Sequence, residues 1–261
     1  MTTFNVEDMK FTFMNSIRTY VYPQQLNHVS SISLFNEGSV VTQEFYPFSD
    51  SINSCGIYVT GTIGTPSELT LEILSGSKTL TTGTVPGTVG WNTLDSVSVA
   101  DVVTARLSTL RITGNVSSGN DYYIGTDTVS SYFYSTITPQ VAFTIGVSDF
   151  IYKVFPMKEI EQRNLPVAVV DVSGRPRIVD KYLSGDNSWL YITLKCDVYS
   201  KYTHEVDKIA YGIERGIYKN RKSFSDVYYV SPGLMSPIGY VNPDVFNRYF
   251  TWTVQQLIAR E

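Results

Sequence analysis

The fold of the C-terminal half is decided by residues 188–200, which read SWLYITLKCDVYS. Every second position in this stretch is apolar: Leu190, Ile192, Leu194, Cys196 and Val198. The positions between them carry Trp189, Tyr191, Thr193, Lys195 and Asp197. Because a period of two residues puts alternate side chains on opposite faces of a strand, the stretch predicts one long β-strand with a buried face.

An amphipathic helix is predicted directly after this strand, over residues 203–220. Its apolar positions follow the spacing of one helical face: Val206, Ile209, Ala210, Ile213 and Ile217. Thr203 is a favourable N-terminal cap, and the acidic start and basic end of the segment suit the helix dipole.

Shorter elements surround this strand and helix. We expect strands at residues 166–172, 177–182, 225–230 and 246–254, and one or two helical turns over residues 148–155, which Pro156 ends. The elements together predict an α+β domain over residues 146–261, with a mixed or antiparallel sheet and one main helix.

Residues 31–140 have a different composition. They are rich in Thr, Ser, Gly and β-branched residues, and their only basic residues are Lys78, Arg106 and Arg111. Short alternating runs at residues 56–60, 69–73 and 107–113 are separated by glycine- and proline-containing turns. This pattern predicts an all-β sandwich, so we expect a two-domain protein.

Residues 1–30 form a separate N-terminal segment in this scheme. Residues 16–23 (SIRTYVYP) resemble residues 149–156 (DFIYKVFP), because both are apolar and aromatic and end in proline. If the likeness is structural, the segment packs on the C-terminal domain and the sandwich is an insertion. Chance similarity over eight residues is the simpler explanation, and both alternatives stay open.

Composition excludes several classes of function. The chain of 261 residues has 20 Lys and Arg against 24 Asp and Glu, a net charge of -4, and no basic run that favours nucleic acid. No apolar stretch is long enough for a membrane helix, and the acidic start MTTFNVEDMK is unlike a signal peptide. We therefore expect no membrane partner and no specific nucleic-acid binding. The two widely spaced cysteines, Cys55 and Cys196, indicate assembly in a reducing cytoplasm.

Catalytic and metal-binding motifs are not found in the sequence. His204-Glu205 starts like a zinc-binding HExxH motif, but position 208 is Lys, and the other candidate ligands are only His28 and the two cysteines. The carboxylates Asp121, Asp127, Asp171, Asp186 and Glu159 could form an acid–base pair only if the fold brought two of them together. We expect no catalytic residue, no metal and no cofactor, so the protein is predicted not to be an enzyme; a hydrolase is a distant alternative.

Exposed aromatic side chains are the best candidates for a binding site in the sandwich. Sugar-binding sandwiches stack their ligands on such rings, so Trp91, Tyr122 and Tyr123 are candidate glycan-stacking residues, with residues 132–134 (YFY) nearby in sequence. Packing in the core is the competing interpretation, because half of each aromatic run on a strand must face inward.

The order of elements in residues 147–261 resembles the tail-terminator and tail-completion (neck) proteins of tailed viruses. The likeness rests on residues 154–156 (VFP), 165–170 (LPVAVV) and 190–199 (LYITLKCDVY), the helix with Glu205, Asp207, Ile209 and Ala210, and the closing aromatic strand. Separately, the sandwich is similar to jelly-roll or carbohydrate-binding-like modules at residues 69–73 (LTLEI), 90–93 (GWNT) and 122–124 (YYI).

These resemblances imply a non-enzymatic structural protein of a virion, assembled in the host cytoplasm. It would form a ring, commonly a hexamer, at the head–tail neck, where it caps the tail-tube protein and docks to the head–tail connector. Strands with aromatic residues on both faces are expected to leave apolar surface for subunit contacts. The alternative is a virion-decorating or tail-tip adhesin whose sandwich binds host-surface glycans.

Overall fold

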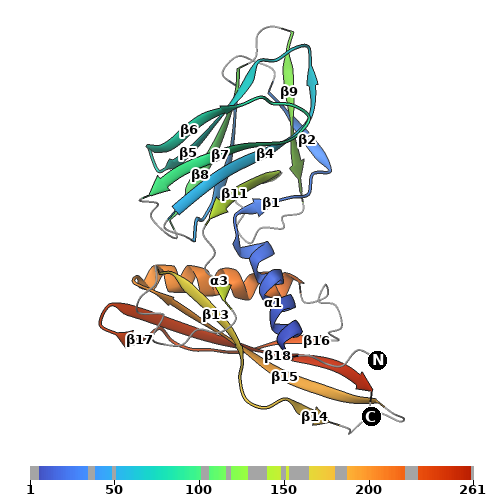
Figure 1. The fold of residues 1–261 in the computed structure, drawn as a ribbon, viewed down its shortest axis with the longest axis vertical. Coiled ribbons are helices and arrows are strands. Elements are labelled where there is room, and N and C mark those ends of the chain that lie inside the picture. Colours follow the sequence, from blue (N-terminus) through green and yellow to red (C-terminus); the bar gives the residue numbers. More distant parts are fainter. Residues whose placement is uncertain are drawn as a thin grey trace. The chain divides into compact units, whose positions relative to one another are not determined.

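The structure is a computed structural model of the chain, and it describes residues 6–34, 39–48, 51–100, 106–115, 119–128, 140–147, 151–152, 165–179, 187–220 and 229–259. Within these residues β-strands dominate, forming three sheets accompanied by two helices (Figure 1). The contacts divide the chain into two compact units: Met1–Arg18 with Phe150–Glu261, and Thr19–Asp149.

The first unit is built on one mixed sheet. Its main strands lie in the order β12 (Ile151–Tyr152), β13 (Val167–Val172), β15 (Asn187–Ser200), β18 (Val245–Ala259) and β16 (Tyr229–Met235). β14 (Arg177–Val179) also pairs with β15, and β17 (Gly239–Asn242) also pairs with β18. All of these pairs are antiparallel except the parallel pair of β12 and β13.

Helix α3 (Thr203–Asn220) covers the apolar face of β15 and β18. The predicted helical stripe is buried throughout, as is the alternating face of β15 from Leu190 to Val198. Phe250, Trp252 and Val254 of β18 continue this buried face. The predictions for residues 188–200 and 203–220 are therefore confirmed.

The other face of this sheet carries both polar and apolar side chains. Lys195 makes an ion pair of 2.8 Å with Asp197, and its ammonium lies 4.7 Å from the centroid of the Tyr249 ring. A small apolar cluster of Val167, Val169, Tyr199 and Val245 lies among the buried residues of the same unit. Tyr229 and Leu257 lie on this face by register and are 52% and 47% exposed, so the face also carries exposed apolar side chains.

Two local predictions in this unit need correction. A helix, α1 (Val6–Val21), occupies much of the N-terminal segment, where only a short turn was expected. Its buried Phe13 ring lies 5.4 Å from the ring of Trp252. Residues 151–152 form strand β12 rather than a helical turn, because they pair with β13; the rest of residues 148–155 lies outside the described residues.

The second unit contains two antiparallel sheets. One has the order β1 (Gln24–Gln25), β11 (Phe143–Val147), β4 (Ser51–Ile63), β9 (Asp121–Asp127) and β10 (Gln140–Val141), with β2 (Ser30–Leu34) on β9 and β7 (Gly90–Ala100) on β4. The other has the order β3 (Val40–Phe45), β8 (Ser108–Asn115), β5 (Glu68–Ser75) and β6 (Lys78–Val85).

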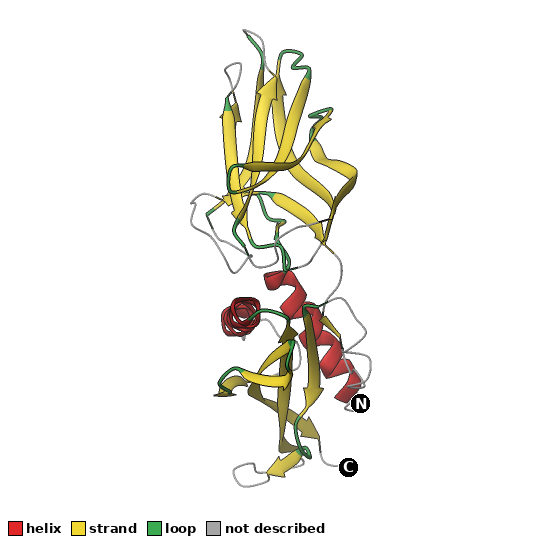
Figure 2. Ribbon diagram, turned by 90° about the vertical axis from the view of Figure 1, so that its left-hand side faces the viewer, coloured by secondary structure: helices red, strands yellow, loops and turns green. Residues whose placement is uncertain are grey.

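The two sheets of the second unit pack face to face, as in a sandwich (Figure 2). Phe45 of one sheet lies 6.4 Å, between ring centroids, from Phe143 of the other. The backbone N–H of Val141 donates a hydrogen bond of 3.1 Å to the buried side-chain oxygen of Gln43. The strands predicted at residues 56–60, 69–73 and 107–113 are confirmed within β4, β5 and β8, whereas the jelly-roll connectivity stays a prediction.

Candidate functional site

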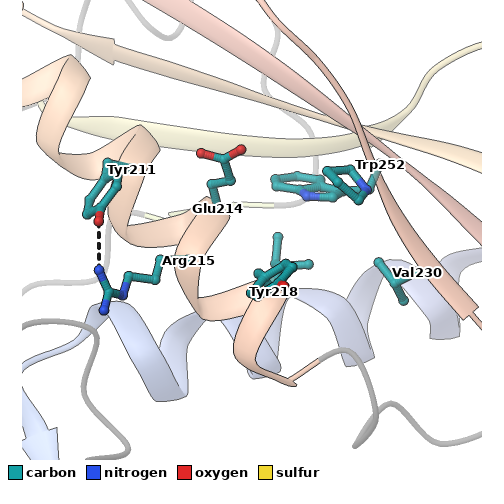
Figure 3. Close-up of a pocket in the computed structure, with 8 residues that line it drawn as sticks. Tyr211, Glu214, Arg215, Tyr218, Val230 and Trp252 are labelled. Carbon is teal, nitrogen blue, oxygen red and sulfur yellow. Dashed lines mark hydrogen bonds between the residues drawn. The ribbon is translucent and has the colours of Figure 1, made fainter.

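A groove of about 530 Å³ lies beside α3 in the first unit (Figure 3). Tyr211, Glu214 and Tyr218 of α3 line one side, and Val230 and Pro232 of β16 line the other. The buried Trp252 of β18 also contributes to its lining. The helical spacing puts Tyr211 and Tyr218 two turns apart on one side of α3, so the helix supplies a row of rings along the groove.

A second hollow of about 440 Å³ shares Tyr211 and Glu214 with the groove. It is more polar, because His204, Lys208 and Arg248 contribute to its lining. Arg248 is held in place by an ion pair with Asp207 of α3 and by a hydrogen bond of 2.8 Å that it donates to the carbonyl of Ser236. The surface beside α3 is therefore apolar at one end and charged at the other.

Glu214 lies where the two hollows meet. In Figure 3 its carboxylate lies between the Tyr211 ring and the Trp252 indole. Its neighbour Arg215 also lines the groove and donates a hydrogen bond of 2.7 Å to the Tyr211 hydroxyl. No ion pair of Glu214 is found in the part of the chain that the structure describes, so its charge is available to a ligand.

The sheet edge next to the groove is rich in exposed apolar side chains. Among the described strands, β16 and β17 pair only with β18, so their outer edge is open. We define the edge surface by its large exposed side chains: Tyr211, Tyr218, Tyr229, Leu234, Ile238 and Tyr240. Tyr240 is 75% exposed and Leu234 is 66% exposed. Tyr229 faces the opposite side of the sheet from Val230, because consecutive strand residues alternate, so the exposed side chains lie on both faces of this edge. Exposed apolar side chains along an open edge are typical of a surface that binds another protein.

A second candidate site, in the other unit, is a row of three rings. Trp91 of β7 lies directly opposite Tyr58 of β4, and their ring centroids are 5.5 Å apart in an edge contact. The Tyr58 ring also stacks on the His28 ring, with 3.7 Å between the ring centroids. Gly125 makes this stack possible, because a Cβ at that position would lie 2.9 Å from the Cβ of His28. Trp91 remains 41% exposed at the end of the row.

The three predicted glycan-stacking residues do not come together. Tyr122 is completely buried against Gly87, so its ring is a core side chain and cannot stack on a sugar. Tyr123 is half-buried and lies opposite Gly61 rather than Tyr58. Only Trp91 joins an exposed ring cluster, and its partners Tyr58 and His28 were not singled out from the sequence. Residues 132–134 lie outside the described residues.

The two cysteines are buried in strands and are unsuited to nucleophilic chemistry. Burial raises the pKa of the Cys55 thiol to about 12, and burial also raises the pKa of Cys196 well above its ordinary value. Both side chains are therefore protonated at neutral pH, and a thiol is a much weaker nucleophile than a thiolate. Cys55 lies inside β4.

The other titratable candidates are dispersed. Asp121 accepts a hydrogen bond from the Ser33 hydroxyl, whereas Asp171 pairs with Lys10 at 2.6 Å. His204 is exposed in the first turn of α3. Among the described residues no group of three or more His, Cys, Asp or Glu side chains could hold a metal ion. Glu159 and Asp186 lie outside those residues.

Comparison with known proteins assigns the chain to no family. No protein-family model matches the sequence, and no curated protein is significantly similar to it. Neither described helix is both long and apolar enough to span a membrane. What the protein does must therefore be inferred from its own surfaces.

Proposed function

We propose that the protein is a non-enzymatic structural subunit of a tailed virus, which self-associates into a ring at the head–tail neck. The ring, a hexamer in the simplest arrangement, caps the tail tube and docks it to the connector. The observation that carries the proposal is the edge surface, where six large apolar side chains are exposed beside an open strand edge and two of them, Tyr211 and Tyr218, line the groove.

The edge surface supports self-association on energetic grounds. Burial of apolar surface contributes about 25 cal/mol per Å², so a cluster of exposed tyrosine and aliphatic side chains favours association. When such a surface meets a different surface of the next copy, the contact is head-to-tail, and a suitable rotation closes it into a ring. A closed ring has no free edge surface left, so self-association stops at one ring.

The test is the mass of the purified chain by light scattering, with negative-stain images of the same peak, alone and with tail-tube protein. Ring particles are expected in at least one of the two conditions. L234E and Y240E should abolish them, because each puts a charge into the apolar contact. V89E is the matched control, since Val89 is 64% exposed but lies in the other unit. A chain that stays monomeric or trimeric and ignores tube protein contradicts the proposal.

Glycan binding is a second candidate function. It is favoured by the row of aromatic side chains formed by His28, Tyr58 and Trp91. Trp91 offers an exposed indole of the kind on which sugar rings stack, and Thr93 and Asp95 follow it at alternate, exposed positions of β7. These side chains could donate and accept hydrogen bonds to sugar hydroxyls.

A titration with soluble glycans tests this candidate. W91A should abolish saturable binding, and Y58A should weaken it, because Tyr58 supports the indole edge-on. Y123A is the control, since Tyr123 lies outside the row. Equal affinity of the wild-type chain and W91A, or no saturable binding of any glycan, rejects the adhesin alternative.

A further inference from the structure

We propose that the groove beside α3 receives a basic segment from a second copy of this chain, namely residues 175–178 (RPRI). The contact would join the Glu214 carboxylate of one copy to the Arg175 and Arg177 guanidinium groups of the next. The inference rests on the proposed self-association and names the two surfaces that meet in it.

The groove is suited to a cation on an apolar stem. Among the described residues its lining includes the rings of Tyr211, Tyr218 and Trp252, one acidic side chain, Glu214, and one basic side chain, Arg215. The Arg215 guanidinium is engaged with Tyr211, 5.9 Å from the centroid of its ring, which leaves Glu214 and the rings of Tyr218 and Trp252 for an incoming cation. Aromatic rings attract cations over their faces, and a guanidinium can stack on a ring while it donates hydrogen bonds to a carboxylate. An Arg side chain meets both requirements better than Lys, whose ammonium is more strongly hydrated.

The same chain exposes a segment with this chemistry. All residues of 173–178 are exposed, and Ile178, next to Arg177, is 60% exposed. In the described part of the chain neither Arg175 nor Arg177 has an ion-pair partner. Pro176 lies between the two arginines and fixes its own φ, which reduces the entropy lost when the segment is bound.

The groove and the basic segment lie at opposite edges of one sheet. The registers put Arg177 of β14 opposite Tyr191 of β15, Tyr191 opposite Gln255 of β18, and Gln255 opposite Tyr229 of β16. A contact between two different edges is head-to-tail, so each copy uses both edges and the chain of contacts can close into a ring. An isologous dimer would instead use one edge twice.

Charge reversal on either edge tests the contact. In E214R a basic groove meets the basic segment of the next copy, and in R175E/R177E the acidic Glu214 meets an acidic segment. Each variant alone should therefore assemble at least about tenfold more weakly than the wild-type chain. In an equimolar mixture every contact again joins opposite charges, in alternating order around the ring. We therefore expect the mixture to restore assembly to within about threefold of the wild-type midpoint concentration.

Controls are E68R, which makes the same charge change as E214R, and K78E, which reverses one basic charge, both at exposed positions of the other unit. These variants should assemble as the wild-type chain does. Circular dichroism and melting temperature verify that all variants are folded, which is expected because the substituted side chains are exposed or half-exposed.

A crosslink locates the contact independently. I178C and Y211C, purified separately and mixed under oxidation, should form a disulfide-linked pair, whereas neither should crosslink to itself. The native cysteines do not interfere, because both are buried.

The outcomes separate this inference from the proposed function. If the wild-type chain forms rings but the charge variants assemble normally, or their mixture does not recover, the contact is overturned and the ring proposal stands. If the wild-type chain forms no ring with or without tube protein, both fail. Loss in each variant with recovery in the mixture supports both.

Discussion

Phe13 of α1 packs against Trp252 of β18, with 5.4 Å between the ring centroids and an interplanar angle of 59°. Phe13 is 2% exposed and Trp252 is 2% exposed, so the contact lies in the core of the first unit. Lys10, one turn earlier on α1, makes an ion pair with Asp171 of β13. Residues from the two ends of the chain thus stabilise one sheet.

Replacing Phe13 by Ala should reduce the free energy of unfolding by about 3–5 kcal/mol, because it leaves a cavity against Trp252. Urea unfolding followed by tryptophan fluorescence measures the loss. F11A is the control on the same helix: Phe11 is 50% exposed, so we expect a change within about 0.5 kcal/mol. Equal losses in the two variants would contradict the packing of α1 on the sheet.

Replacing Ser200 by Ala should also destabilise the first unit. The Ser200 hydroxyl donates a hydrogen bond to the carboxylate of Glu205, and both side chains are at most 2% exposed. The variant leaves a buried carboxylate without this donor, which costs about 1–3 kcal/mol of unfolding free energy, or more if the carboxylate stays charged.

The midpoint of urea unfolding tests the Ser200 prediction against S231A. Ser231 lies on β16 of the same unit, and its hydroxyl donates a hydrogen bond of 3.3 Å to the adjacent Pro232 carbonyl at the surface. A loss for S200A no larger than that for S231A would show that the Ser200–Glu205 bond contributes little.

Gly87 and Gly76 form a matched pair for testing the core of the second unit. Both have positive φ, +68° and +60°, so Ala at either position costs roughly 1–2 kcal/mol in backbone strain. Only at Gly87 would the new Cβ also meet the Tyr122 ring, at 2.4 Å from its nearest atom; at Gly76 nothing lies within 4 Å.

G87A should therefore be less stable than G76A by about 1–3 kcal/mol, the usual range for overpacking a core. Thermal unfolding of both variants measures the difference. Equal melting temperatures would show that Tyr122 moves aside without cost, and that its ring is not fixed in the core.

Local patterns predicted the centre of the first unit well. Two local signals are strong, because in each of them five apolar residues recur at a constant spacing. One is the two-residue alternation of residues 188–200, and the other is the helical stripe of residues 203–220. Helix α1 has a comparable signal at Phe13, Met14, Ile17 and Val21, but two threonines and a serine weaken its helix propensity. It is stabilised by packing against distant strands, which a local pattern does not contain.

The features that local patterns did not predict depend on which strands pair and on the register of each pair. Alternation predicts that Tyr122 and Tyr123 face opposite sides, but only the pairing of β9 with its neighbours shows that Tyr122 faces the core. Likewise, Tyr58 and Trp91 become neighbours only through the register of β4 and β7. The edge strands β16 and β17 were underpredicted because Pro232, Gly233 and Pro237 are typical of loops; at an open edge, however, proline is tolerated.

Buried thiol and phenol groups should make the protein less stable at alkaline pH. Burial raises the pKa of Cys55 from its ordinary value near 9 to about 12, and burial is also the main cause that raises the pKa of Tyr199 to about 12. Between pH 9 and 12 the unfolded chain therefore binds fewer protons at Cys55 than the folded chain. Stability falls with rising pH over this range, by up to about 1.4 kcal/mol per pH unit for each such group.

Urea unfolding at several pH values between 8 and 10.5 measures this dependence. Stability should be nearly independent of Cys55 ionisation at pH 8 and should fall steadily above pH 9. C55A is expected to be less stable at pH 8, because it leaves a cavity, but its stability should fall less steeply with pH, since one linked group is gone. If the slopes of C55A and the wild-type chain above pH 9 are equal, the Cys55 thiol ionises as easily in the folded chain as in the unfolded one.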